Sequence, residues 1–416
     1  MQQELKAKSN STPQIGSDNN TVRRIILISY LFLVIIACLG ALLRILPFSS
    51  FSISYNNLIH AHSHGAFLGW LFLANFAITG YLIQYKLSTK VIVCLAADVL
   101  LLLLTVPLFV KYGYNYITII LSTLHVILST FLALQLIKQI GFKNLRSFNG
   151  YKSYLVLAWI CLIISGIFPL ILGIIVKSFG NASPAYYNTI YTYLHFQYNG
   201  FFVSSILAII HFYLGSVNDM KLKIAYHLFA LSVPLTLTNS YLWCAPGFWF
   251  NVISTVACVM QLTACMFLLN IKSLLQSLEN RIPFSLNWVI YGLILKSIMQ
   301  FVVSFPYVAV ASYSNRYLIL FYLHFVLLGI ISITIIKMTA SILNITNIFY
   351  YRIAINVLKL VFLITQALMA YKAAEMEGLF HYSNLTLPFL AIISILFPLI
   401  LVTVLIVSLI EKPKVS

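Results

Sequence analysis

The residues best suited to chemistry in this sequence are its histidines. Three of the nine lie within five residues of one another, and two more follow at long, nearly equal intervals. Imidazole nitrogens are common ligands of haem iron and of copper. We interpret five histidines as candidate cofactor-binding residues: His60, His62, His64, His195 and His324.

The long intervals form a period. His64 and His195 are 131 residues apart, and His195 and His324 are 129 apart. The tetrapeptide Tyr-Leu-His-Phe occurs at both 193–196 and 322–325. Internal repeats are common in polytopic membrane proteins, and their functional sites lie at repeat interfaces. The period predicts three equivalent units, each presenting a histidine to a shared centre.

The three histidines of segment 60–64 do not all lie on one face of a helix. His60 and His64 are four residues apart and therefore share one face of a helix, while His62 points to the opposite side. Gly65 and Gly69 follow and leave room for a flat ligand if they face inward. The candidate metal ligands are His60, His64, His195 and His324, with His125 as a further candidate. No residue is singled out as catalytic.

The elements that position these histidines are membrane helices. Hydrophobic residues make up 61% of the 416 positions, charged residues 8%, and the mean hydropathy is +0.98. A soluble domain has about 25% charged residues, so the sequence predicts an all-α polytopic protein of about 12 transmembrane helices in three pseudo-repeats of four. The expected spans are 25–47, 57–83, 91–110, 115–137, 153–176, 190–215, 224–241, 249–270, 287–310, 317–336, 353–371 and 385–410.

The formal net charge of +17 reflects how the chain is oriented in the membrane. With the N-terminus placed in the cytosol, 18 of the 25 Lys and Arg residues fall in cytosolic segments and 5 in external ones. This is the positive-inside pattern, and it predicts both termini in the cytosol, in a bacterial inner (plasma) membrane. The excess of positive charge is therefore explained by membrane topology, and we expect no nucleic-acid partner.

The rest of the chain adds little chemistry. Residues 1–22 are polar and predict a disordered cytosolic tail, followed by one transmembrane domain at 23–412. The six cysteines contain no Cys-x-x-Cys pair, so neither a thiolate metal site nor a disulfide framework is expected.

Charged side chains within the expected spans suggest a second possible function. Ionisable groups inside a bilayer are default functional candidates, and Lys296 and Asp98 are weak candidates for proton relay. Asp98 and Lys359 lie near the inner surface, where snorkelling to the interface is expected instead. The alternative to a haem protein is therefore a haem-free, proton-coupled secondary transporter.

Twelve helices with histidines on the second, sixth and tenth resemble subunit I of the haem–copper oxidase and nitric oxide reductase superfamily. The segment His-Ala-His-Ser-His-Gly-Ala-Phe-Leu-Gly-Trp at 60–70 also resembles the second-helix motif of the NnrS family of haem- and copper-containing membrane proteins. These resemblances imply three arcs of four helices, haem on the second and tenth helices, and copper on the sixth.

The chain departs from that pattern. The seventh span has only His227, the tenth only His324, and Asn199 stands where a tyrosine would follow His195. The resemblance therefore implies one haem, of b type, with a degenerate copper site. We expect a role in electron transfer, respiration or the response to nitric oxide or oxygen, with respiratory-chain partners. An oxidoreductase activity is left open, but full oxygen reductase activity is not expected from this chain alone.

Overall fold

The computed structural model describes residues 19–215, 219–270 and 282–411, and every element in these ranges is helical. The twelve expected spans each coincide with one helical segment. The segments are α2 (Asn19–Ile45), α3–η3–α4 (Tyr55–His64, Gly65–Leu71, Phe72–Leu82), α5 (Thr89–Tyr112), α6 (Tyr116–Ile140), α7 (Tyr151–Phe179), α8–η5–α9 (Pro184–His195, Phe196–Phe202, Val203–Leu214), α10–η6 (Met220–Leu235, Thr236–Cys244), α11 (Phe248–Asn270), α13–α14 (Leu286–Val303, Pro306–Ser314), α15–η7–α16 (Arg316–His324, Phe325–Ser332, Ile333–Ile342), α17 (Phe349–Met376) and α18–α19 (Thr386–Ser394, Leu396–Ile410).

Ten helices in the described ranges are long and apolar enough to cross a membrane, which confirms an integral membrane protein. The two remaining segments are 184–214 and 220–244. The first carries polar side chains at its centre, among them His195, Gln197 and Asn199. The second has an α-helix of only 16 residues before it tightens into a 3₁₀-helix.

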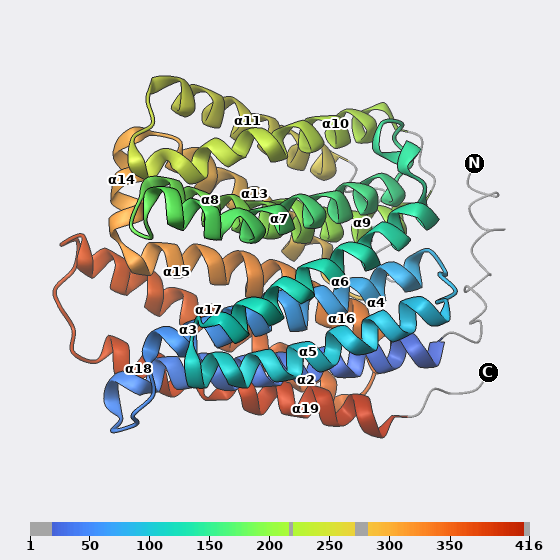
Figure 1. The fold of residues 1–416 in the computed structure, drawn as a ribbon, viewed down its shortest axis with the longest axis horizontal. Helices are drawn as coiled ribbons and strands as arrows, with labels where there is room; N and C mark the ends of the chain where they lie inside the picture. The colour runs from blue at the N-terminus through green and yellow to red at the C-terminus, as the bar shows by residue number, and fades with distance from the viewer. Residues whose placement is uncertain (1–18, 216–218, 271–281, 412–416) are drawn as a thin grey trace.

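The segments run alternately between two ends of the bundle (Figure 1). We call the end where α2 begins and α19 ends the near end, and the opposite end the far end. The first and last helices pack against each other, and the Arg23 guanidinium donates to the carbonyl oxygens of Ser408 at 2.8 Å and Glu411 at 2.6 Å. These contacts join the first and last described helices.

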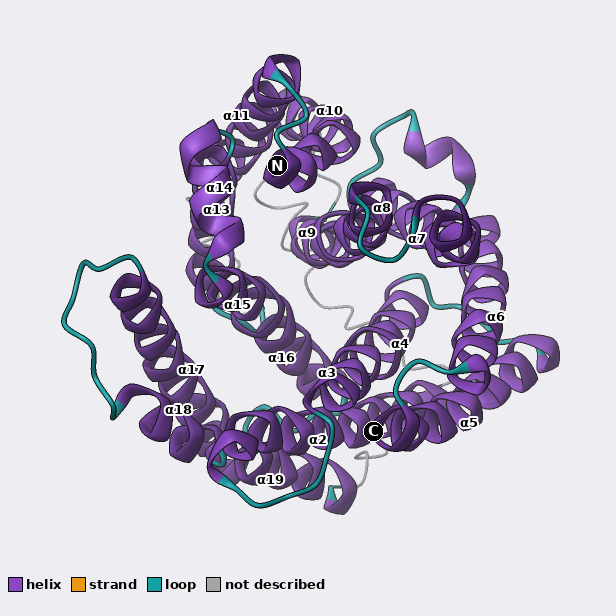
Figure 2. Cartoon of the chain, turned by 60° about the vertical axis from the view of Figure 1, so that its left-hand side comes forward, coloured by secondary structure: helices purple, strands orange, loops and turns teal. Residues whose placement is uncertain are grey.

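Three segments form the centre of the bundle: α3–α4, α8–α9 and α15–α16, with the other helices around them (Figure 2). Their near halves touch, because α4 contacts α16 and η5 contacts η7. The Trp70 indole also donates to the Ser332 hydroxyl at 3.0 Å. The central helices are therefore the second, sixth and tenth, the three that the histidine period singled out.

The expected tail at 1–22 needs one correction. Helix α2 already begins at Asn19, so residues 19–22 belong to the first transmembrane helix. Residues 1–18 lie outside the described residues.

Candidate functional site

Each central helix is interrupted by a π-helical segment, and each interruption begins directly after a histidine. The segment η3 follows His64, η5 follows His195, and η7 follows His324. π-Helical turns are rare in proteins and occur frequently at functional sites. The same irregularity at three positions about 130 residues apart is independent support for the predicted three pseudo-repeats.

The central helices are packed tightly only in their near halves. Ten of the eleven residues of α4 and seven of the ten of α16 are buried. In the far halves, α3 buries two of ten residues and α15 none of nine, although α15 lies between α14 and α17 (Figure 2). His60, His62, His64 and His324 therefore lie in the less closely packed halves and are half-buried, whereas His195 is buried.

His62 and His324 are held in the same way. Nδ1 of His62 lies 2.9 Å from the carbonyl oxygen of Ile36 on α2, and Nδ1 of His324 lies 2.8 Å from the carbonyl oxygen of Leu320. A carbonyl only accepts, so each Nδ1 carries the proton and each neutral ring keeps its lone pair on Nε2. Neither Nε2 has a hydrogen bond to another described residue. This tautomer is the one that haem and metal ligands adopt, with Nδ1–H held by a backbone carbonyl.

Gly40 on α2 leaves room for the His62 ring. A Cβ added to Gly40 would lie 3.0 Å from Cε1 of the His62 ring. Any larger residue at position 40 would therefore press on the imidazole, so the glycine lets His62 lie against α2.

Arg44 lies beside this pair. Arg44 is close enough for its charge to affect both His62 and His324, and His62 is close enough to affect His324. The Arg44 Nη2 atom contacts only the Met369 sulfur, at 3.4 Å, and Nη1 is buried without a hydrogen-bond partner. An unpaired guanidinium is costly to bury, and its planar fork matches a carboxylate.

His60 and His64 face another part of the bundle. They share one face as predicted, and both contact Tyr114 in the connection between α5 and α6. The Tyr114 hydroxyl lies 3.3 Å from Nε2 of His64, and its ring centre lies 4.4 Å from that of His60. The His64 ring also lies 4.3 Å from the ring of Phe109. It is therefore His62, and not the pair His60 and His64, that accompanies His324.

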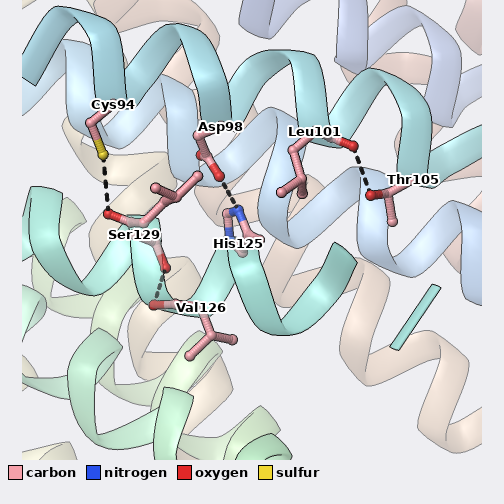
Figure 3. A network of polar contacts seen from close by, with 8 residues as sticks. Cys94, Asp98, Leu101, Thr105, His125, Val126 and Ser129 are labelled. Carbon is pink, nitrogen blue, oxygen red and sulfur yellow. Dashed lines mark hydrogen bonds and ion pairs between the residues drawn. The ribbon is translucent and has the colours of Figure 1, made fainter. Parts of the chain in front are cut away.

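Asp98 and His125 form a buried pair between α5 and α6 (Figure 3). Nδ1 of His125 lies 2.8 Å from Oδ1 of Asp98, and both side chains are almost fully buried. Asp98 therefore does not snorkel to the interface as expected, because His125 offers it a partner inside the bundle. Its second oxygen, Oδ2, is buried without a partner.

His195 already uses both ring nitrogens. Nε2 lies 2.7 Å from the carbonyl oxygen of Val233, and Nδ1 lies 3.2 Å from Nδ2 of Asn199. The ring is completely buried. The copper role that the resemblance implied for His195 would require Nδ1 to give up its contact with Asn199, while Nε2–H could keep its hydrogen bond to Val233.

A chain of side-chain hydrogen bonds through two amides connects His195 to Lys296. Asn199 accepts from Gln300 at 3.4 Å, and the Lys296 ammonium donates to the side-chain oxygens of Gln300 at 2.6 Å and Gln261 at 3.0 Å. The two glutamines were missed in the sequence because an uncharged amide gives no signal in an apolar span. The i,i+4 spacing of Lys296 and Gln300 was the available hint.

No group of three or more His, Cys, Asp or Glu residues in 19–215, 219–270 and 282–411 is arranged to hold a metal ion. The predicted ligands are divided instead between three places: His62 with His324, His60 and His64 with Tyr114, and His195 with the amides. The described residues therefore do not fit a protein-held copper ion. His62 and His324 are neutral imidazoles whose Nε2 atoms have no partner among the described residues, and imidazole nitrogen is a common ligand of haem iron.

Gly65 and Gly69 serve the packing of helices. A Cβ at Gly65 would lie 2.7 Å from Ile36, and one at Gly69 would lie 2.4 Å from the Phe32 ring. Both glycines bring η3 against α2, so they face a helix rather than a flat ligand.

Comparison with known proteins adds no further constraint. The chain matches no model of a protein family, and no curated protein is similar enough to count as a relative.

Proposed function

We propose that this protein binds one haem between α3 and α15, with His62 and His324 as axial ligands, and acts as an electron-transfer protein of the membrane. The observation that carries the proposal is the matching arrangement of these two histidines. They come from different central helices, each is oriented by a backbone carbonyl through Nδ1, and each keeps Nε2 free.

Arg44 gives the second support. A haem carries carboxylates, and the buried Nη1 of Arg44 has no hydrogen-bond partner among the residues that the structure describes. A carboxylate there would neutralise the guanidinium and accept its free hydrogen bond. Arg44 would thus fix the orientation of the group that the two imidazoles hold.

A haem with two nitrogen ligands supplies reversible one-electron transfer between ferric and ferrous iron. The protein's part is to hold the imidazoles in one tautomer, to compensate the propionate charge and to keep the site within an apolar bundle. This role agrees with the resemblance to the haem–copper oxidase and NnrS families, and it implies a respiratory electron partner. Since the copper ligands are missing, we expect no substantial oxygen reduction by this chain alone.

We also propose a bacterial inner membrane, with the near end in the cytosol. The support is the distribution of positive charge, with 18 Lys and Arg residues in segments on one side and 5 on the other. The far end, where the histidines lie, would then be on the external side.

The test is the haem content and spectrum of purified variants. His62→Ala and His324→Ala should each abolish the low-spin spectrum or the bound haem, while the protein still inserts. His64→Ala and His211→Ala are the controls, because His64 faces Tyr114 and His211 lies near the other end of its segment. A low-spin spectrum that survives His324→Ala would rule out this ligand pair and favour His195 or His125.

A second candidate function is proton-coupled transport without haem. It is favoured by Lys296, a buried cation held only by amides, and by the buried Asp98–His125 pair. Such groups are typical of proton relays in transporters. This function predicts a colourless wild-type protein whose transport is lost in Lys296→Met, whereas Lys296→Met should leave a haem spectrum unchanged.

A further inference from the structure

An open groove lies between α5 and α6, two helices at the outer edge of the bundle (Figure 2). Its volume is about 530 Å³, which is within the range of sites that bind small molecules. The residues that line it are Thr89, Lys90, Val93, Cys94, Ala97, Leu128 and Phe131. Each of these side chains is exposed or half-buried, so the groove is accessible from the surrounding lipid.

Small side chains on α5 leave the space for this groove. Cys94 and Ala97 are three residues apart and therefore share a face of the helix. The Cys94 thiol donates to the carbonyl oxygen of Leu128 on α6 at 3.8 Å, which places that face next to α6. Leu128 and Phe131, also three residues apart, line the groove from the other helix. Since the thiol already has an acceptor, the inner part of the groove is apolar.

The groove extends from the near end of the bundle to the middle of the membrane. Lys90 is the second residue of α5, and Leu128 lies twelve residues before the near end of α6. At 1.5 Å per residue, Leu128 is therefore at a depth of about 18 Å. The hydrocarbon core of a bilayer is about 30 Å thick, so the groove is about as long as one leaflet is deep. A lipid acyl chain has this length, whereas a helix of a second copy would cross the whole membrane.

The opening of the groove at the near end is positively charged. Lys90 lines it and belongs to neither of the two ion pairs among the described residues. The helix α5 begins at Thr89, directly after its cap Ser88, so its first backbone N–H groups have no acceptor within the helix and favour an anion. Among the described residues, the acidic side chains at the near end are Asp219, which caps α10, and Glu411. A second copy of the chain therefore offers little negative charge to this opening, whereas a lipid phosphate complements it.

We propose that this groove binds an anionic phospholipid of the near-end leaflet. The phosphate lies at Lys90 and the N-terminus of α5, and one acyl chain lies along the groove between Ala97 and Phe131. The length of the groove, its apolar interior and its positive opening are the three properties that fit this occupant. The proposal is independent of the haem.

The test is native mass spectrometry of the full-length protein, purified in detergent, stripped of lipid and supplied with phosphatidylglycerol or phosphatidylcholine. Ala97→Phe fills the groove and should retain one phosphatidylglycerol fewer per chain than the wild type. The matched control is Ala96→Phe, which adds the same ring to an exposed neighbour that does not line the groove and should retain as many as the wild type. Equal retention by Ala97→Phe and Ala96→Phe would overturn the proposal. So would a dimer of the wild type that Ala97→Phe separates, because the occupant would then be a second copy.

A second set of variants tests the headgroup. The wild type should prefer phosphatidylglycerol to phosphatidylcholine at this site by about fivefold, the contribution expected of one lysine near an anionic lipid. Lys90→Gln should lose that preference, and Lys90→Arg should keep it because it preserves the charge. Lys86→Gln is the matched control, since Lys86 is exposed near the same end but does not line the groove, and it should keep the preference. A preference in Lys90→Gln equal to that of Lys86→Gln would overturn the role of Lys90 and with it the anionic lipid.

Discussion

Single hydrogen bonds decide which histidines can bind a ligand. His62, His64, His195 and His324 look equivalent as ionisable residues in membrane helices, but their ring nitrogens differ in what they contact. His195 has both nitrogens bonded, and Nε2 of His64 contacts Tyr114. Only His62 and His324 of the four combine a fixed Nδ1 with an Nε2 free of other described residues. Sequence spacing predicted that His62 lies on another helix face than His60 and His64. Which neighbouring residues each face contacts depends on where α2, α5 and α15 lie, and spacing does not show that.

His195 is therefore predicted to be structural. His195→Ala should leave any haem spectrum unchanged, since its nitrogens are held by Val233 and Asn199. It should lower the free energy of unfolding by about 1–3 kcal/mol, because the buried hydrogen bond from Nε2 to the Val233 carbonyl is lost and that carbonyl keeps the Thr236 hydroxyl as its side-chain donor. Absorbance spectra and unfolding in detergent measure both effects. A loss of haem with unchanged stability would make His195 a ligand.

Asp98 gives a second prediction at this scale. Asp98→Leu removes the acceptor of His125 and leaves a buried N–H unpaired, which should cost about 1–3 kcal/mol of unfolding free energy. Asp98→Asn keeps an oxygen at the same place and should cost clearly less. Thermal unfolding of the two variants in the same detergent compares them. Equal stability of Asp98→Leu and the wild type would show that the contact at 2.8 Å contributes nothing.

At the scale of elements, the π-helical segments shape the centre. Each inserts an irregular turn just after a histidine, and each is followed by a tightly buried half-helix. Hydropathy predicted the spans within a few residues, because an apolar stretch of about 20 residues is sufficient to identify a membrane helix. It gave no sign of the π-helical segments, since an extra residue in a turn depends on packing against the neighbouring helices.

The glycines of the second segment provide a matched test. A Cβ at Gly69 would lie 2.4 Å from the Phe32 ring, whereas a Cβ at Gly80 on the same segment would meet nothing within 4 Å. Gly69→Ala should lower the free energy of unfolding by about 1–3 kcal/mol through overpacking. Gly80→Ala should be neutral or stabilising by up to about 1 kcal/mol. Thermal midpoints that fall in the reverse order would contradict the packing of η3 on α2.

At the scale of the whole molecule, the twelve segments cross the membrane in alternating directions, so the orientation of one segment fixes which loops are cytosolic and which are external. Reporter fusions after Ser88 and Gly150 should read cytosolic, and fusions after Phe51, Gly180 and Asn384 should read external. The reason is the concentration of Lys and Arg on one side of the membrane. Phosphatase and fluorescent-protein fusions at each site measure this. One reversed pair would remove the basis for placing the histidines on the external side.

The whole fold also explains what the sequence could and could not show. The period of 131 and 129 residues singled out the three helices that carry a π-helical segment directly after a histidine, and the three repeats themselves stay a prediction. Two partners were not predictable because they come from other helices, namely His125 of Asp98 and Gln261 of Lys296. The second partner of Lys296, Gln300, lies four residues along the same helix. In an apolar chain, pairing between distant segments leaves no local pattern to read.

The central claim is that the bundle holds one haem, and the visible spectrum of the purified wild-type protein tests it most directly. The account predicts a Soret band that shifts on reduction with dithionite, the split α and β bands of a low-spin b-type haem, and about one haem per chain by pyridine haemochrome assay. A colourless protein after expression with sufficient haem would contradict the account and leave proton-coupled transport as the better proposal.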